Sequence, residues 1–366
     1  MERVGREQAL AFRLAAHNLH ERLPAGSEAE AAAVIGLQDF PPGLAPVALA
    51  ARVADADIDA LAIVYAWRGA AVAVPRADVR VFTTGLAPPH DGAARTLIGT
   101  AVESLDPEGI SATEALDRVS AAVADALAAG PLERDDFHQA LRERLPEELL
   151  WWCRGCQSHH VHPSLWRATG VRGVLAVAER RGRVTVFGAP PKGRAVKDPP
   201  AELTRRFLHA YGPATRSELA GWAGIAPAHA RELLDRVAGE LQEVDFDGRR
   251  ALILAADADR LADPPAARGV RLLPPFDPYL DQRDRDTLFP DKELRARARS
   301  GIGAPGAVLV DGALAGLWRP AKKGKRLVVT VEPVTKAARK AADAIAAEAA
   351  IVAPHRGCER AEVVFS

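Results

Sequence analysis

The beginning of the chain combines helical and strand-like patterns of apolar residues. Apolar positions recur at helical spacing over residues 6–23, and two short stretches, 46–54 and 56–65, repeat this pattern between charged positions. Residues 70–74 instead form a continuous apolar run that Pro75 ends, which is typical of a strand. A first module that starts as helices and contains a strand is therefore predicted.

A second module is predicted after it. Helical spacing fills roughly residues 90–145. Two β-rich runs, 173–178 and 183–187, are joined by a charged tip, as in a hairpin that forms the wing of a winged helix. Residues 189–200 are rich in proline and glycine and are interpreted as a linker.

Residues 201–255 have the pattern of one small unit. A first helix ends at Gly212-Pro213, and Thr215 is a candidate N-cap of the next helix, with Glu218 three residues later as its capping-box partner. A third helix follows, and two strands pair across Asp247-Gly248. Three helices and a hairpin predict a winged helix. Its third helix either presents three basic side chains, His229, Arg231 and Arg236, to DNA, or belongs to a unit that serves only as a structural spacer.

The last hundred residues turn to strands. Asp311-Gly312 predicts a tight hairpin, and an alanine-rich helix over 336–351 closes the chain. The predicted fold class is α+β, with tandem winged-helix modules followed by a C-terminal β-barrel-like domain. The predicted divisions are a first winged-helix-like module, a second with the hairpin, a third winged helix and the barrel-like domain, over residues 1–100, 101–190, 199–256 and 265–366.

Composition limits the function classes. Apolar residues make up 48% and charged residues 26% of the 366 residues, which is usual for a folded chain. The 48 Lys and Arg balance the 48 Asp and Glu, so a nucleic-acid role requires local basic patches. Charges interrupt the first thirty residues, and only three cysteines are present, so we expect a protein of the cytoplasm with no membrane partner. Association with the nucleoid and a monomeric state are further expectations.

The segment CRGCQSHHVH, residues 153–162, concentrates two thiols and three imidazoles. This composition suits zinc, but the spacing is not that of a zinc finger, and the remaining cysteine, Cys358, lies far away in sequence. A packed, hydrogen-bonded turn is the other interpretation, and no metal or cofactor is predicted. In an extended segment His160 and His162 project from one face while Val161 points to the core, as paired donors to a phosphate would.

A second polar segment, GLQDFPPG, sets Gln38 and Asp39 among apolar residues, before two prolines that fix the backbone. Buried side chains of these types require hydrogen-bond partners, and capping of neighbouring helices is the simplest use for them. Catalysis is the alternative.

The densest run of basic residues comes near the end of the chain. It forms either a clamp on a phosphate backbone or a solvated hairpin tip. Its members are Arg319, Lys322, Lys323, Lys325 and Arg326.

Several segments together resemble a known family. GLQDF, AWRGAAVAVPRADV, CRGCQSHHVH, RRFLHAYGPATRSELAGWAG, LLPPFDPYLDQRDR and VLVDGALAGLWR are similar, in order, to the winged-helix family that includes the AlkZ and YcaQ DNA glycosylases, which unhook interstrand crosslinks. The resemblance implies a DNA glycosylase that excises N7-alkylated purines from alkylated or crosslinked double-stranded DNA.

The resemblance also implies functional residues. The family's catalytic triplet, Gln-apolar-Gln or Gln-apolar-Asp, falls on Gln38, Asp39 and Phe40, so the carboxylate is one position early. Its His-apolar-His motif is matched by His160, Val161 and His162. A non-catalytic DNA-binding protein or regulator with the same modules is the alternative. Further phosphate contacts are expected from Arg68, Arg283, Arg319, Lys322 and Lys323.

Overall fold

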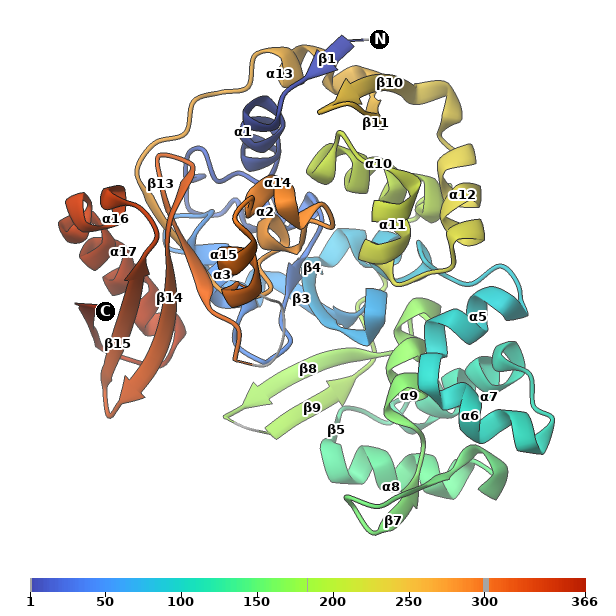
Figure 1. Ribbon diagram of the computed structural model, residues 1–366. Coiled ribbons are helices and arrows are strands. Elements are labelled where there is room, and N and C mark those ends of the chain that lie inside the picture. Colours follow the sequence, from blue (N-terminus) through green and yellow to red (C-terminus); the bar gives the residue numbers. More distant parts are fainter. Residues whose placement is uncertain (1, 183, 299–302) are drawn as a thin grey trace. The chain divides into compact units, whose positions relative to one another are not determined.

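The computed structural model describes residues 2–182, 184–298 and 303–366. It divides into two compact units, each assembled from separate chain segments. The first unit contains residues 1–60, 205–218 and 239–366, and the second contains residues 61–204 and 219–238. The four predicted modules stay a prediction. Mixed helices and sheets confirm the α+β class (Figure 1).

The first unit begins with a short strand and three helices. Its chain then returns in a hairpin, and β1 pairs in parallel with the first strand of that hairpin. The turn residues Asp247 and Gly248 both have positive φ, as a two-residue hairpin requires, so this predicted turn is confirmed. These elements are β1 (Glu2–Val4), α1 (Arg6–Ala16), α2 (Glu28–Ala33), β2 (Leu37–Gln38), α3 (Ala45–Ala50), β10 (Leu241–Phe246), β11 (Arg249–Leu254) and α13 (Ala258–Ala262).

The C-terminal part of the first unit is a sheet in the order β12-β13-β14-β15-β16. The predicted tight turn at Asp311-Gly312 joins β13 to β14, with φ of 47° and 78°. The barrel-like prediction is wrong, because over the described residues the sheet stays open, with β12 and β16 at its edges. The elements are β12 (Val270–Leu273), α14 (Arg285–Leu288), α15 (Lys292–Arg297), β13 (Gly306–Val310), β14 (Ala313–Lys323), β15 (Arg326–Pro333), α16 (Lys336–Lys340), α17 (Ala342–His355) and β16 (Arg360–Phe365).

A helix covers the apolar face of the open sheet. α17 packs against β12, β15 and β16, and its buried Ile345, Ala349 and Val352 share a core with sheet residues such as Val329 and Val331. Because this helix buries the apolar face of the sheet, the edge strands do not have to meet. The predicted single helix over 336–351 is two helices, α16 and α17.

Two buried ion pairs tie the first helices to the segment before α14. Arg13 donates to Asp284 at 2.8 Å, and Arg52 donates to both carboxylate oxygens of Asp277 at 2.8 Å. All four side chains are at most 4% exposed. Removing one partner would leave a buried charge, so these pairs fix the packing of α1 and α3 in the unit. They account for Asp277 and Asp284, two of the five charged residues of the LLPPFDPYLDQRDR segment.

The second unit contains strands in the order β4-β3-β8-β9-β5 and a group of helices around one core. Its elements are β3 (Leu61–Tyr65), β4 (Ala71–Pro75), α4 (Val79–Thr84), α5 (Asp91–Ile98), α6 (Val102–Leu105), α7 (Ala112–Ala126), β5 (Leu132–Glu133), α8 (Arg134–Arg144), β6 (Trp151–Cys153), β7 (Ser158–His160), α9 (Pro163–Ala168), β8 (Ala176–Arg181), β9 (Val184–Gly188) and α12 (Pro227–Asp235).

The helical prediction for residues 56–65 is wrong. Leu61–Tyr65 is the strand β3, which pairs antiparallel with β4 and buries Val64 completely. Its β-branched Ile63 and Val64 suit a pleated, buried strand better than a helix. The predicted hairpin with a charged tip is confirmed as β8 and β9, and the predicted linker before residue 199 has neither helix nor strand.

The remaining helices, α10 (Pro199–Tyr211) and α11 (Arg216–Ala223), have residues in both units. The predicted capping box is confirmed, because Thr215 N donates to Glu218 at 2.6 Å and Glu218 N donates to Thr215 Oγ1 at 3.3 Å.

The prediction that the third helix of the 201–255 segment presents His229 to DNA is wrong. In α12, His229 is 4% exposed and cannot face DNA. It shares the buried face of the helix with Leu233 four residues later, and burial lowers its pKa.

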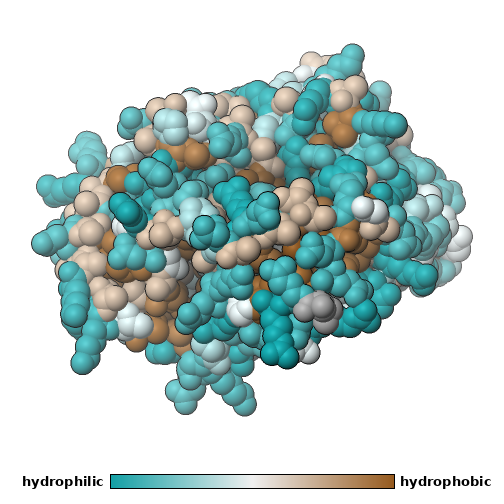
Figure 2. All heavy atoms as spheres, turned by 90° about the horizontal axis from the view of Figure 1, so that it is seen from above, coloured by the Kyte–Doolittle hydropathy of each residue, from teal (hydrophilic) through white to brown (hydrophobic). Residues whose placement is uncertain are grey.

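The view in Figure 2 shows a face covered mainly by hydrophilic residues, with separated hydrophobic patches. Within the ranges that the structure describes, none of the helices combines the length and the hydropathy that a membrane crossing requires.

Candidate functional site

Gln38 ends the short strand β2 in the first unit and is half-buried. Its Nε2 donates to the carbonyl oxygen of Phe40 at 2.9 Å. A carbonyl can only accept, so this bond fixes which end of the carboxamide is the nitrogen. The other end, Oε1, is an acceptor that can orient a water molecule.

Asp39 has a different environment, since it is 2% exposed. Its Oδ1 accepts from the backbone N–H groups of Gly43, Leu44 and Ala45, at 2.7, 3.1 and 3.3 Å. These groups lie at the beginning of α3, where an anion is favourable and N–H groups lack helical partners. The carboxylate therefore ties the loop 39–43 to the helix, as the capping interpretation expects.

This loop borders a cavity of about 270 Å³ within the first unit. Arg356, which follows α17, donates to the carbonyl oxygen of Gly43 at 3.3 Å, and Lys322 on β14 donates to the carbonyl oxygen of Gly357 at 2.8 Å. The structure thus brings the segment after Gln38 together with one of the predicted phosphate contacts. The cavity is lined by Pro42, Gly43, Pro320, Lys322, Leu327, His355 and Arg356.

The basic residues of the β14–β15 hairpin fall into two groups. Arg319 and Lys322 donate to backbone carbonyls, which carry no net charge, and Lys323 is exposed. Lys325 and Arg326 face Glu359 and Glu362, at 2.5 and 2.9 Å. In the part of the chain that the structure describes, the three basic residues of β14, Arg319, Lys322 and Lys323, therefore have no carboxylate paired with them.

The other two predicted phosphate contacts, Arg283 and Arg68, have different environments. Arg283, in the first unit, is paired with Asp281 at 3.1 Å and has a side chain 30% exposed. Arg68, in the second unit, is exposed, and it has a left-handed backbone with φ of 55°. The stem of Arg68 passes so close to Gly224 that a Cβ there would lie 2.7 Å from it. Glycine at 224 makes this approach possible.

In the second unit, the CRGCQSHHVH segment is the β6–β7 hairpin and its continuation into α9. His160 ends β7, and its Nδ1 lies 2.8 Å from the carbonyl oxygen of Val161. Because this oxygen only accepts, the neutral ring carries its proton on Nδ1 and leaves a lone pair on Nε2. His160 in this form cannot donate to a phosphate through Nε2.

His162 has the opposite arrangement. It is the N-cap of α9, and its Nδ1 accepts from the backbone N–H of Ser164 at 3.2 Å. The neutral ring therefore carries its proton on Nε2, which can donate to a phosphate oxygen. Burial first, and the neighbouring His160 second, lower the pKa of His162, so that it is neutral near pH 7. Val161 between the two is 1% exposed, in agreement with the predicted alternation.

Sequence reasoning missed Arg356 and His355 at the cavity. Gly357, with φ of 65°, marks the helix end that brings them there, and a glycine after an alanine-rich helix is a recognisable signal of such an end. More than 300 positions separate them from Gly43, and no pattern in the sequence indicates that these segments meet.

Comparison with known proteins gives three findings. The model of the family described as DNA glycosylase AlkZ-like matches residues 30–354. The interstrand DNA cross-link repair glycosylase of Streptomyces sahachiroi is 32% identical over 206 residues. This match covers 52% of the chain and 54% of the curated relative, so the chain spans about half the length of that relative. The solved structure of Streptomyces sahachiroi DNA glycosylase AlkZ matches with a TM-score of 0.76 and 23% identity over 100% of both chains, which indicates a shared fold.

Proposed function

Because the chain belongs to the AlkZ-like DNA glycosylase family, we propose that it is a monofunctional DNA glycosylase acting on duplex DNA. Its proposed reaction is hydrolysis of the N-glycosidic bond of N7-alkylated purines, in crosslinks or in single adducts. The orientation of the Gln38 carboxamide is the observation that carries this proposal.

Cleavage of the N-glycosidic bond of an N7-alkylated purine requires little assistance from a catalytic group. Alkylation at N7 puts a positive charge on the purine, so the base leaves as a neutral molecule while the sugar becomes an oxocarbenium ion. No general acid is needed. Gln38, with Nε2 held by the carbonyl of Phe40, directs Oε1 to accept a hydrogen bond from the water that attacks C1′, and this water releases its proton to solvent.

We assign Asp39 to positioning. Its Oδ1 already accepts from the backbone N–H groups of Gly43, Leu44 and Ala45, which favours a role in holding Gln38 at the end of β2 over direct proton transfer. A buried negative charge still helps an oxocarbenium ion electrostatically at longer range. The position of the carboxylate, one residue before its place in the family triplet, agrees with this division of roles.

Phosphate contacts are assigned to the exposed basic side chains of Arg319, Lys322 and Lys323 on β14 and of Arg68, and to Nε2 of His162. Such contacts supply sequence-independent affinity that weakens with salt, which suits a repair protein that must bind any sequence.

Release of N7-methylguanine from alkylated duplex DNA tests the proposal. The wild type is compared with Gln38→Ala, and Gln139→Ala on the exposed face of α8 is the matched control. Loss of the water-orienting group is expected to lower the release rate by about 100-fold or more, with DNA affinity unchanged. The control should keep the wild-type rate.

A non-catalytic winged-helix DNA-binding protein or regulator is the competing function. The observation in its favour is that the one carboxylate of the triplet is occupied by backbone N–H groups. Intact DNA binding by the wild type without base release from methylated or crosslinked duplexes would reject the glycosylase and support this alternative.

A further inference from the structure

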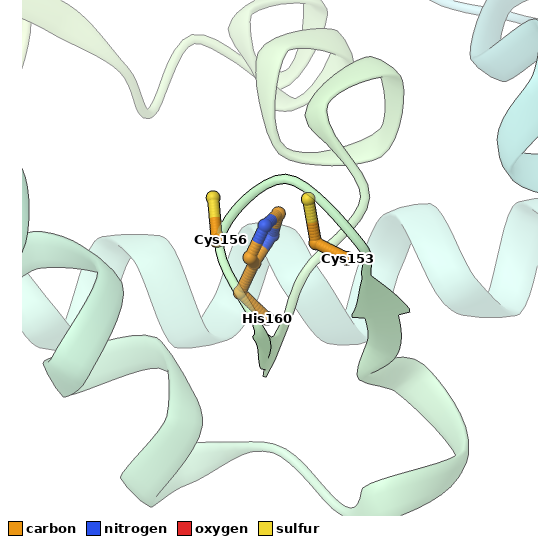
Figure 3. A group of neighbouring side chains, drawn as sticks. All are labelled: Cys153, Cys156 and His160. Carbon is orange, nitrogen blue, oxygen red and sulfur yellow. The ribbon is translucent and has the colours of Figure 1, made fainter.

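The turn of the β6–β7 hairpin gathers two thiols and an imidazole that the proposed glycosylase does not use. Cys153 ends β6, Cys156 lies in the turn and His160 ends β7, a spacing of Cys-x2-Cys-x3-His. The two Sγ atoms and a ring nitrogen of His160 all lie within 4.8 Å of one another. All three side chains project to the same side of the hairpin, with the imidazole between the thiols (Figure 3).

Burial does not explain these cysteines. Cys358 of the same chain is 5% exposed and packs in a core, which is usual for a free cysteine. Cys153 is half-exposed and Cys156 is exposed. Two thiols kept together at a surface turn therefore require another reason.

The hydrogen bonding of His160 prepares it for a metal. Its Nδ1 donates to the carbonyl oxygen of Val161 at 2.8 Å, which leaves the lone pair on Nε2. Metal-binding histidines commonly donate their second N–H to a backbone carbonyl in this manner, which fixes the ring and its tautomer. Trp151 and His138 pack against the ring, at centroid distances of 5.9 and 5.8 Å.

We propose that Cys153, Cys156 and His160 bind one zinc ion, which closes the β6–β7 hairpin. Two thiolates and one imidazole are a ligand set that zinc prefers, and tetrahedral Zn–S bonds of about 2.3 Å place ligand atoms about 3.8 Å apart. Small side-chain rotations bring the three groups to that spacing. Both thiols release their protons to solvent on binding, and water takes the fourth position beside the exposed Cys156.

This inference does not depend on the proposed glycosylase. It removes His160 from the phosphate contacts and leaves that role to His162, two residues later. By fixing the end of β7, the zinc ion would position the N-cap of α9 and with it Nε2 of His162.

The test is the zinc content of the purified full-length protein, measured by mass spectrometry of the metal after removal of unbound ions. One zinc per chain is expected in the wild type. Less than about a tenth of that is expected in Cys153→Ser, Cys156→Ser and His160→Gln, since each removes one of three protein ligands. Cys358→Ser and His159→Gln change the same residue types outside the cluster and should keep one zinc.

Cobalt replacement gives a second measurement. The metal-free wild type titrated with Co²⁺ should develop a thiolate-to-metal charge-transfer band that saturates at one equivalent and is absent in Cys156→Ser. Three outcomes overturn the proposal: a wild type without zinc whose three thiols all titrate as free, a Cys153–Cys156 disulfide in protein purified under reducing conditions, or full zinc content in the ligand variants.

Discussion

The loop that follows β2 and the segment from β6 to α9 both carry polar family motifs, but the backbone uses their side chains in opposite ways. In the loop, the charged residue Asp39 is buried and accepts from backbone N–H groups, while Gln38 beside it is half-buried and keeps its carboxamide oxygen available. In the second segment, the apolar Val161 is buried, and each imidazole keeps one ring nitrogen outside the hydrogen bonds to the backbone.

The comparison shows that the chemistry of a motif depends on which side-chain atoms remain after the others form hydrogen bonds with the backbone. His160 and His162 are two residues apart and chemically identical. A carbonyl next to the first and an N–H next to the second give them opposite tautomers, so one offers a lone pair and the other a proton. Gln38 and Asp39 divide in a similar way into an available and an occupied group.

Within this comparison, the largest effect is expected for the stability of Asp39→Ala. This change leaves the N–H groups at the beginning of α3 without their acceptor. Loss of a charged cap of this kind is expected to lower the free energy of unfolding by about 2 kcal/mol, and denaturant unfolding followed by tryptophan fluorescence measures it. The exposed Asp259 in the same unit supplies the control Asp259→Ala, with a change of less than about 0.5 kcal/mol.

Asp39→Asn sharpens this prediction. It keeps an oxygen acceptor but removes the charge, and part of the stability should return. If Asp39→Ala instead keeps the wild-type stability and abolishes base release, the carboxylate is catalytic, and the contrast between the two residues of the loop disappears.

The second effect is on the salt dependence of DNA binding and concerns the basic residues of β14, of which Lys322 lines the cavity beside the loop. Each lysine that releases a counterion from DNA contributes about 0.9 to the slope of log affinity against log salt. Lys322→Gln combined with Lys323→Gln should therefore reduce that slope by about 1.8, which binding titrations at several salt concentrations measure.

Lys325→Gln is the control for this patch. It removes the same charge from the same hairpin, but Lys325 already faces Glu359 at 2.5 Å. Its effect on the slope should be smaller than that of Lys323→Gln alone. Equal effects of the two single changes would mean that the hairpin acts through its total charge and not through three selected side chains.

The sequence predicted local features well where a few neighbouring residues determine them. Both two-residue turns, at Asp247-Gly248 and Asp311-Gly312, and the Thr215–Glu218 capping box are present, because each depends on residues at most three positions apart. The class of the fold was predicted for the same reason, from the spacing of apolar residues.

Features that depend on distant partners were missed. The sheet was expected to curl into a barrel, since nothing in the strands shows that α17 covers them. The helical prediction at Leu61–Tyr65 failed because pairing with β4 outweighs local spacing. In the candidate site, Gln38 and Asp39 were predicted as candidate functional residues. The difference in burial that separates their roles depends on α3 and on the fold of the whole unit.

The smallest effect is expected at His162, and it tests the comparison most directly. Asn is a good N-cap, so His162→Asn should preserve the start of α9 and the free energy of unfolding, while it removes the Nε2 donor. Loss of one phosphate contact should weaken binding to alkylated duplex DNA by about 5-fold, or about 1 kcal/mol. His159→Gln, at an exposed imidazole of the same hairpin, should leave the affinity unchanged. If His162→Asn binds DNA like the wild type while His162→Ala does not, His162 serves only as a cap, and the donor assigned to it from its tautomer has no role in recognition.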